Sequence, residues 1–207
     1  MNLDLRDRSC LVIGGGKVAE RKALSLLEAG AEVKVISPTL ALKLQELSTS
    51  GKISHRNKVF EDKDLEGVFL VIVATNSSEV NCRVALLCKQ KRILVNVSSP
   101  PEESTFIVPS VVERGALVIA ISTEGASPAL AKKIREDLEK VYGPEYGLFL
   151  ERMSLLRRKL QAEINDEGLR RKVVQAVVES DVLYLLKSGR LKEADHRIAE
   201  IVKAETT

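Results

Sequence analysis

A glycine-rich turn between a strand and a helix constrains this chain more than any other feature of its sequence. The apolar run CLVI, within residues 9–13, is followed at once by three glycines at 14–16 and then by the helical pattern VAERKALSLLEAG. That pattern stops at Gly30, a residue type common just past helix ends, and the β-branched run at 33–36 predicts a second strand. The sequence therefore predicts a βαβ unit that opens a parallel sheet.

The same turn matches the fingerprint of dinucleotide-binding folds, in the form Gly14-x-Gly16-x-x-Ala19. Gly14 allows the tight turn, Gly16 lets the backbone approach a diphosphate, and Ala19 permits close packing of the helix on the strand. The free N–H groups at the start of the helix then face the phosphates. A glycine turn that serves packing alone is the alternative, but the strand and helix around it favour a cofactor site.

One element of that fingerprint is missing at the end of the second strand. The sequence there reads Ile36-Ser37-Pro38-Thr39, with no Asp or Glu to hold the ribose hydroxyls. We therefore expect ribose contacts from Ser37, Thr39 or the backbone. Without an acid to repel a 2′-phosphate, the sequence leaves NAD and NADP both open.

The next segments continue a doubly wound sheet. Residues 68–74 (VFLVIVA) are apolar at every position, as a central parallel strand must be, and a helix at 78–90 and a strand at 93–97 follow. The polar residues Thr75 and Asn76 would lie in the crevice beyond the strand ends, where open α/β sheets bind ligands. A simple strand-ending turn would explain Asn76 equally well.

After Val97 the pattern changes. The segment SSPPEEST predicts a loop, and residues 106–112 and 117–121 predict two antiparallel strands joined by a turn. Ser127-Pro128 predicts a capped helix start, and only helical patterns follow from Pro144. We expect an α/β Rossmann-type, doubly wound parallel sheet at 1–113, a small dimerisation segment at 114–145 and a C-terminal helical domain at 146–207.

Composition excludes several other classes of protein. Aromatic residues make up 3% of the chain and the net charge is +3, so neither a stacking platform nor a basic surface for nucleic acid is expected. The two histidines and three cysteines form no ligand spacing, so we expect no metal held by the protein. No secretion signal or long apolar run is present, which favours a cytoplasmic protein without a membrane partner.

Three stretches together carry a family likeness: VIGGGKVAERKALSLLEAGAEVKVISP, then VIVATNSSEVN, then NVSSPPEESTFIVPSVVERGALVIAISTEGASPALAKKIREDLE. In order and spacing they resemble the precorrin-2 dehydrogenase and sirohydrochlorin ferrochelatase family of sirohaem synthesis, in its stand-alone form. The resemblance runs from the N-terminus to about Tyr142 and covers GxGxxA together with two further motifs, which makes it far more specific than the glycines alone.

The resemblance implies a function and a set of contacts. Family members oxidise precorrin-2, a polycarboxylate tetrapyrrole, to sirohydrochlorin with NAD, some also insert ferrous iron, and they are typically homodimers. The substrate is implied to lie beside the loop after Val97, and Asn96, directly before that loop, is a candidate substrate contact. The implied cofactor contacts are Gly14, Gly15, Gly16, Lys17, Val18, Pro38, Thr39 and Thr75.

This chain departs from the family at one position of that loop. Family members usually carry an Asp where this sequence has Ser99. A carboxylate can accept the proton released by oxidation, whereas an unassisted serine is a very poor base at neutral pH. Three explanations stay open: Glu102 or Glu103 substitutes, the substrate's carboxylates or water take the proton, or the chain binds without efficient turnover. The missing acid also makes iron insertion less expected.

A polycarboxylate substrate needs clustered positive charge and backbone donors. Lys132, with Lys133 and Arg135, lies near the start of the helix at Pro128 and is a candidate. A solvated helix face is the commoner role of such residues. The preceding small-residue loop could hold a carboxylate at the helix N-terminus, although ordinary capping explains it equally well. Its candidate residues are Ser122, Thr123, Gly125 and Ser127.

Two other interpretations compete with this one. Another nicotinamide-dependent oxidoreductase could use the same fold, because fold alone does not fix a substrate. A nucleotide-sensing regulatory domain without catalysis also opens with a strand and a glycine turn. Such domains generally carry an acid after the second strand, and this chain has none there.

Overall fold

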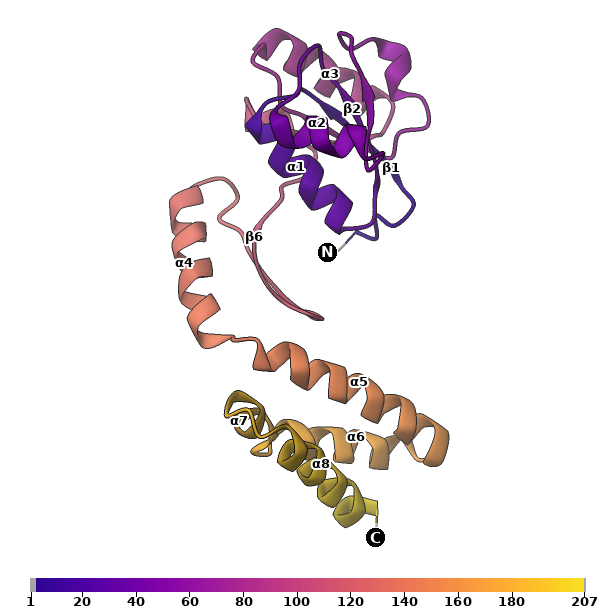
Figure 1. Ribbon diagram of the computed structural model, residues 1–207, viewed down its shortest axis with the longest axis vertical. Helices are drawn as coiled ribbons and strands as arrows, with labels where there is room; N and C mark the ends of the chain where they lie inside the picture. Colours follow the sequence, from indigo (N-terminus) through magenta and orange to yellow (C-terminus); the bar gives the residue numbers. More distant parts are fainter. Residues whose placement is uncertain (1–2, 207) are drawn as a thin grey trace. The chain divides into compact units, whose positions relative to one another are not determined.

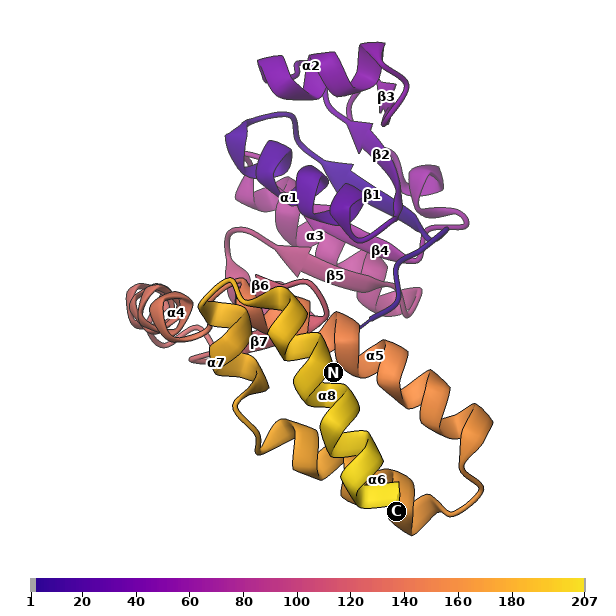
Figure 2. The same ribbon diagram turned by 60° about the horizontal axis from the view of Figure 1, so that its bottom comes forward.

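Five parallel strands form the centre of the N-terminal part of the chain, in the order β3-β2-β1-β4-β5 (Figure 2). This is the doubly wound parallel sheet that the sequence predicts. The computed structural model describes residues 3–206 and divides into two compact units, between Val108 and Pro109. The strands are β1 (Ser9–Ile13), β2 (Glu32–Ile36), β3 (Ser54–Arg56), β4 (Leu70–Val73) and β5 (Leu94–Val97).

The register of the sheet brings the carboxyl ends of its central strands to one edge. Ile13 at the end of β1 pairs with Ile36 on one side and with Val73 on the other, and Val73 pairs with Val97. Because all these strands run in one direction, the segments that follow them emerge side by side. The glycine turn therefore lies between the segments that follow β2 and β4.

Helices cover both faces of the sheet, and each face has its own apolar core. Helices α1 (Lys17–Glu28) and α2 (Leu42–Thr49) pack on the face that includes Cys10 and Val12. Helix α3 (Ser78–Gln90) and the short 3-10 helix η1 (Asp62–Leu65) cover the opposite face. Figure 2 shows α1 and α3 on the two sides of the strands. Burial on both faces is why β1 and β4 are apolar at nearly every position.

The second unit begins with a two-stranded antiparallel ribbon of β6 (Ser110–Arg114) and β7 (Leu117–Ile121), followed by α4 (Pro128–Val141), as Figure 1 shows. Arg114 fixes the end of this segment, because its Nε donates to the carbonyl oxygen of Tyr142 at 2.9 Å. The predicted strand at 106–112 is wrong in its bounds: pairing starts only at Ser110, directly after Pro109, which has no N–H to donate.

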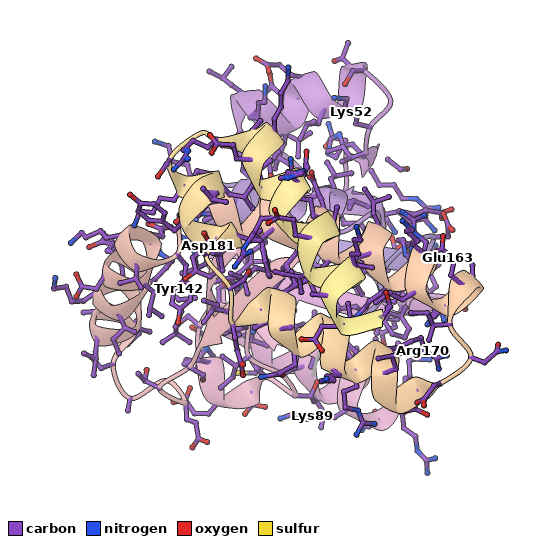
Figure 3. The ribbon with its side chains drawn as sticks, turned by 90° about the horizontal axis from the view of Figure 1, so that it is seen from below. Lys52, Lys89, Tyr142, Glu163, Arg170 and Asp181 are labelled. Atoms are coloured by element: carbon purple, nitrogen blue, oxygen red, sulfur yellow. The ribbon has the colours of Figure 1, made fainter. Side chains whose placement is uncertain are left out.

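Four helices complete the second unit around a separate apolar core that includes Leu160, Val173 and Leu186. Arg170 closes the bend between the first two, donating from Nη1 to the carbonyl oxygens of Ile164 at 2.6 Å and Asn165 at 3.0 Å. Figure 3 labels Arg170 at this bend. The helices are α5 (Glu145–Glu163), α6 (Glu167–Val178), α7 (Val182–Lys187) and α8 (Leu191–Thr206).

The finer division of the chain, with boundaries after residues 113 and 145, stays a prediction. No helix within residues 3–206 has the length and apolar character needed to cross a bilayer.

Candidate functional site

A cleft of about 800 Å³ opens at the carboxyl edge of the sheet, around the glycine turn. Its walls come from the ends of β1, β2 and β4, from the residues that follow each of them, and from parts of the segment after β3 and of α3. Eight of the nine predicted cofactor contacts line it: Gly14, Gly15, Gly16, Lys17, Ser37, Pro38, Thr39 and Thr75. The ninth, Val18, lies outside the lining and is exposed on the first turn of α1.

The first two glycines of the turn are required by close backbone contacts. Gly14 has φ +118°, and a Cβ there would lie 2.3 Å from the carbonyl oxygen of Ala74. A Cβ on Gly15 would lie 1.8 Å from the carbonyl oxygen of Thr39. Any side chain at either position would have to displace backbone, so the turn brings the β2 and β4 ends within van der Waals reach of β1.

Gly16 differs, because nothing lies within 4 Å of the position its Cβ would take. It precedes α1, which starts without a side-chain cap, so the first N–H groups of the helix face open space. Ala19, one turn later, is fully buried against the sheet, as the motif predicts. The turn therefore presents free amide donors to the cleft while its other side is packed shut.

The cations of the cleft differ in how far they are already neutralised. Lys58 Nζ lies 2.8 Å from Asp64 Oδ2, and Arg83 Nη2 lies 2.6 Å from Asp62 Oδ1. Lys17 makes no ion pair with any of the residues that the structure describes. Lys17 and the helix N-terminus are therefore the positive groups best able to meet a diphosphate.

Asp64 holds the segment that brings Lys58 to the cleft. Its side chain is 1% exposed, and its Oδ2 accepts from the backbone N–H of Glu61 at 2.9 Å. Burial acts to raise the pKa of this carboxyl, but the hydrogen bonds from Lys58 and Glu61 and the nearby charges outweigh burial, so the pKa lies below its ordinary value. No motif predicted Lys58, Val59, Phe60 or Arg83 as cleft residues. The first three belong to a segment without a recognisable pattern, and Arg83 lies on the predicted helix at 78–90, where nothing in the sequence marks it as a cleft residue.

The loop after β5 carries the predicted catalytic residues. Ser99 is exposed, and its carbonyl oxygen accepts from Asn81 Nδ2 at 2.7 Å. Glu103, in the 3-10 helix η2 (Pro101–Glu103), lies with Oε2 2.6 Å from Nζ of Lys89, which is labelled in Figure 3. Glu102 is exposed and has no hydrogen bond or ion pair within residues 3–206. Of the two glutamates, Glu102 is the one free to accept a proton.

The predicted substrate contacts fall in both units. Asn96 is 9% exposed at the end of β5, and its Nδ2 donates to the carbonyl oxygen of Phe106 at 3.0 Å. The others belong to the second unit, on the loop between β7 and α4 and on α4 itself. Their role as substrate contacts stays a prediction.

Within the second unit, the hydroxyls of the loop before α4 already accept backbone N–H groups. Ser127 Oγ accepts from Leu130 at 3.2 Å, and Thr123 Oγ1 accepts from Ser127 at 3.1 Å. Ser122 Oγ accepts from the backbone N–H of Glu124 at 3.1 Å. Gly125 has φ +85°, a conformation that favours glycine. On the first turns of α4, Lys132 Nζ lies 3.7 Å from Glu136 Oε1. These contacts match helix capping and a solvated helix face.

Comparison with known proteins adds family matches over most of the chain. Residues 1–110 match the family described as putative NAD(P)-binding, and residues 114–140 match that described as sirohaem biosynthesis protein central. The structure is similar to that of a protein named SirC, precorrin-2 dehydrogenase, with a TM-score of 0.78, 30% identity, and coverage of 97% of this chain and 98% of that one.

Curated relatives are also similar in sequence. A siroheme synthase from Thioalkalivibrio sulfidiphilus is 40% identical over 186 residues, which are 90% of this chain and 38% of the relative. One from Methylococcus capsulatus is 37% identical over 202 residues, 98% of this chain and 43% of the relative. The chain thus spans about two fifths of the length of these curated relatives.

Proposed function

Because the chain belongs to the putative NAD(P)-binding family and to the family of the precorrin-2 dehydrogenase SirC, we propose that it oxidises precorrin-2 to sirohydrochlorin. NAD is the hydride acceptor in this proposal, and the oxidation is a step of sirohaem synthesis. Membership confirms the resemblance noted in the sequence and the predicted Rossmann-type, NAD-binding fold.

The cleft at the glycine turn is the observation that carries the proposal. Its volume of about 800 Å³ suits a dinucleotide, and its floor combines the free amides at the start of α1 with the charge of Lys17, which no described residue neutralises. Open space at Gly16 leaves room for phosphate oxygens against the backbone. When bound, NAD supplies the site that accepts a hydride; the residues around it hold and orient the dinucleotide.

Oxidation of precorrin-2 releases a proton as well as a hydride, and a group of this chain or of the substrate must take that proton. We assign this role to Glu102. The carboxylate of Glu103 faces the Lys89 ammonium, whereas Glu102 is solvated and free of described partners on the same 3-10 helix. The Ser99 hydroxyl has no hydrogen bond with any residue that the structure describes, so no neighbouring base prepares it to accept a proton. The Ser99 carbonyl oxygen accepts from Asn81.

The test of the proposed function is an anaerobic assay with NAD and enzymatically made precorrin-2. We expect the absorption of sirohydrochlorin to appear together with that of NADH, in equal amounts. NADH formation no faster than in a control without protein would contradict catalysis and favour a domain that binds its ligand without turnover.

Three variants separate the possible proton acceptors. Glu102→Gln should lower kcat by about a hundredfold if its carboxylate takes the proton, while Glu103→Gln should change kcat little. Ser99→Asp should raise the rate if a missing carboxylate limits it. Equal and small effects of both glutamate variants would point to the carboxylates of the substrate or to water instead.

We further propose that the protein works in the cytoplasm as a homodimer joined through its central segment. Three exposed apolar side chains on β7 and α4 support this: Val118, Leu130 and Val141, with 45%, 51% and 59% exposed. Light scattering should then give about twice the chain mass of 22.8 kDa. A monomeric mass at micromolar concentration would contradict the dimer.

A further inference from the structure

Asn81 is a buried polar residue whose contacts connect two functional segments. It lies in the first turn of α3, its side chain faces away from water, and only 2% of the residue is exposed. A buried amide keeps its place only where its donors and acceptor are matched by partners. At Asn81 all the partners belong to the segments that follow β4 and β5.

The hydrogen bonds of Asn81 fix the orientation of its amide. Nδ2 donates to the carbonyl oxygen of Ser99 at 2.7 Å and to that of Thr75 at 3.2 Å. Carbonyl oxygens only accept, so the NH₂ group must face both of them. Oδ1 therefore faces the hydroxyl of Thr75, at 2.6 Å, and that hydroxyl must donate to it.

This arrangement also determines what Thr75 offers to the cleft. A threonine hydroxyl has one hydrogen, and here it is directed at Asn81. Its oxygen accepts the N–H of Ser77 at 3.2 Å. The carbonyl oxygen of Ser77 also lies 3.2 Å from it, as a second and more distant acceptor. The hydroxyl hydrogen of Thr75 is therefore engaged within the protein, and Thr75 offers no donor to a molecule in the cleft.

The bridge begins where the backbone ladder of the sheet stops. The last ladder contact between the two segments is the N–H of Ser98 on the carbonyl oxygen of Val73, at 2.9 Å. Beyond it, β4 and β5 no longer pair, and Asn81 spans the gap between Thr75 and Ser99. The side chain thus extends the alignment of the two strands into the loops.

We propose that Asn81 is a positioning residue that couples the dinucleotide-binding segment after β4 to the Ser99 segment after β5. The inference rests on the proposed function, in which the first segment holds NAD and the second carries the proton acceptor. Asn81 touches neither NAD nor substrate in this role. It acts by keeping Thr75 and the Ser99 loop in one fixed relation.

Two variants and one matched control test this. Asn81→Leu keeps the approximate size of the side chain and removes all of its hydrogen bonds. Asn81→Asp replaces the amide donor by an acceptor. Thr105→Val is the control, because Thr105 Oγ1 also bonds the backbone of β5, accepting from the N–H of Val95 at 2.9 Å, but has no hydrogen bond with the segment after β4. Each variant is assayed for kcat, KM, NAD affinity and thermal stability.

We expect Asn81→Leu to lower kcat by roughly tenfold, because two carbonyls and a hydroxyl lose their partner, while Thr105→Val stays within about twofold of wild type at a similar loss of stability. Burial raises the pKa of a carboxyl, and the carboxyl introduced by Asn81→Asp can donate to the Ser99 carbonyl once it is protonated. The rate of Asn81→Asp relative to wild type should therefore rise as pH is lowered from 8 to 6.

Equal kcat values for Asn81→Leu and Thr105→Val would overturn the inference, as would a flat pH ratio for Asn81→Asp. If Asn81→Leu does not fold, the Asn81→Asp ratio decides alone.

Hydrogen exchange separates this inference from the proposed function. In wild type and Thr105→Val, added NAD should increase protection of residues 98–105, and in Asn81→Leu it should not. Protection without any oxidation of precorrin-2 would defeat the proposed function and leave the coupling standing. Oxidation without NAD-induced protection in wild type would defeat the coupling alone.

Discussion

At the scale of single residues, the three glycines of the turn are needed for different reasons. Gly14 and Gly15 are set by backbone oxygens at 2.3 and 1.8 Å from the positions a Cβ would take, whereas Gly16 faces open space. The fold therefore requires the first two, whereas no packing contact requires Gly16, in keeping with the proposed contact between its backbone and a diphosphate. A substitution series can distinguish stability from binding within three consecutive positions.

We expect Gly15→Ala to lower the free energy of unfolding by about 2 kcal/mol or more, because the Thr39 carbonyl must move. Gly16→Ala should cost less than about 1 kcal/mol. It should nevertheless weaken NAD binding, by roughly tenfold, because its methyl group occupies the approach to the helix amides. Urea unfolding and calorimetry measure the two effects. A Gly16→Ala protein with unchanged NAD affinity would place the diphosphate elsewhere.

We expect Thr39 to influence a second property of the cleft, its preference between NAD and NADP. It is exposed, lines the cleft after β2, and stands in a segment without a carboxylate. Thr39→Glu should weaken NADP binding about tenfold more than NAD binding, because the new charge repels a 2′-phosphate. Titration calorimetry with both dinucleotides measures the ratio, with Thr39→Gln as the uncharged control. An equal ratio of NAD to NADP affinity in the two variants would contradict a place for Thr39 beside the ribose.

At the scale of elements, the segment from β3 to η1 forms the outer wall of the cleft and depends on buried charge. The Asp64 side chain, almost wholly buried, forms ion pairs with Lys58 and, at 3.4 Å, with Arg56. It also accepts a hydrogen bond from the backbone N–H of Glu61. Losing one partner of such a cluster leaves others unmatched. The position of Lys58 beside the cleft thus follows from the folding of a loop.

The lowered pKa of Asp64 gives this loop a pH dependence. Its ordinary pKa is 3.8 and its folded pKa is lower, so the stability it contributes is fully present above about pH 4 and is lost as pH falls through the folded pKa. Asp64→Asn should cost on the order of 1–2 kcal/mol at pH 7. That difference from wild type should shrink at lower pH, as urea unfolding across pH would measure.

Asp62→Asn is the matched control for that series. Asp62 lies on the same 3-10 helix, and its pair with Arg83 is half exposed, so its loss should cost less than about 1 kcal/mol. A penalty for Asp64→Asn that stays constant down to pH 3 would show that charge is not its origin.

The elements that the sequence predicted are those with strong periodicity or special turn residues. Strands β1, β2, β4 and β5 and helices α1, α3 and α4 follow apolar runs, a glycine turn and a Ser-Pro start. Helix α2, strand β3 and η1 were not predicted, because α2 buries only Leu44 and Leu47 and β3 has three residues. The candidate site divides in the same way: the turn can be recognised in the sequence, whereas the roles of Lys58 and Asn81 follow only from tertiary contacts.

At the scale of the whole molecule, two units hold separate apolar cores. The sheet and its helices bury two clusters within residues up to Val108, and α5 to α8 bury a third. The dinucleotide cleft lies wholly within the first unit. Ligand binding should therefore stabilise one unit directly.

Differential scanning calorimetry should reveal two unfolding transitions, and NAD should raise the midpoint temperature of only one of them. At a hundred times its dissociation constant, a ligand adds about 2.7 kcal/mol to the state that binds it. The same NAD concentration should move that transition less in Gly16→Ala. A single transition that shifts as a whole would mean that the units unfold together.

The donation of the Thr75 hydroxyl hydrogen to Asn81 has a consequence for inhibitor chemistry. An ether, ester or carbonyl oxygen of a compound designed for this cleft gains no hydrogen bond from the Thr75 hydroxyl, because that hydrogen is already donated to Asn81. An acceptor placed beside Thr75 should thus add no affinity to a mimic of the dinucleotide. The polarity of the best scaffold at this spot is determined by an asparagine that the compound never touches.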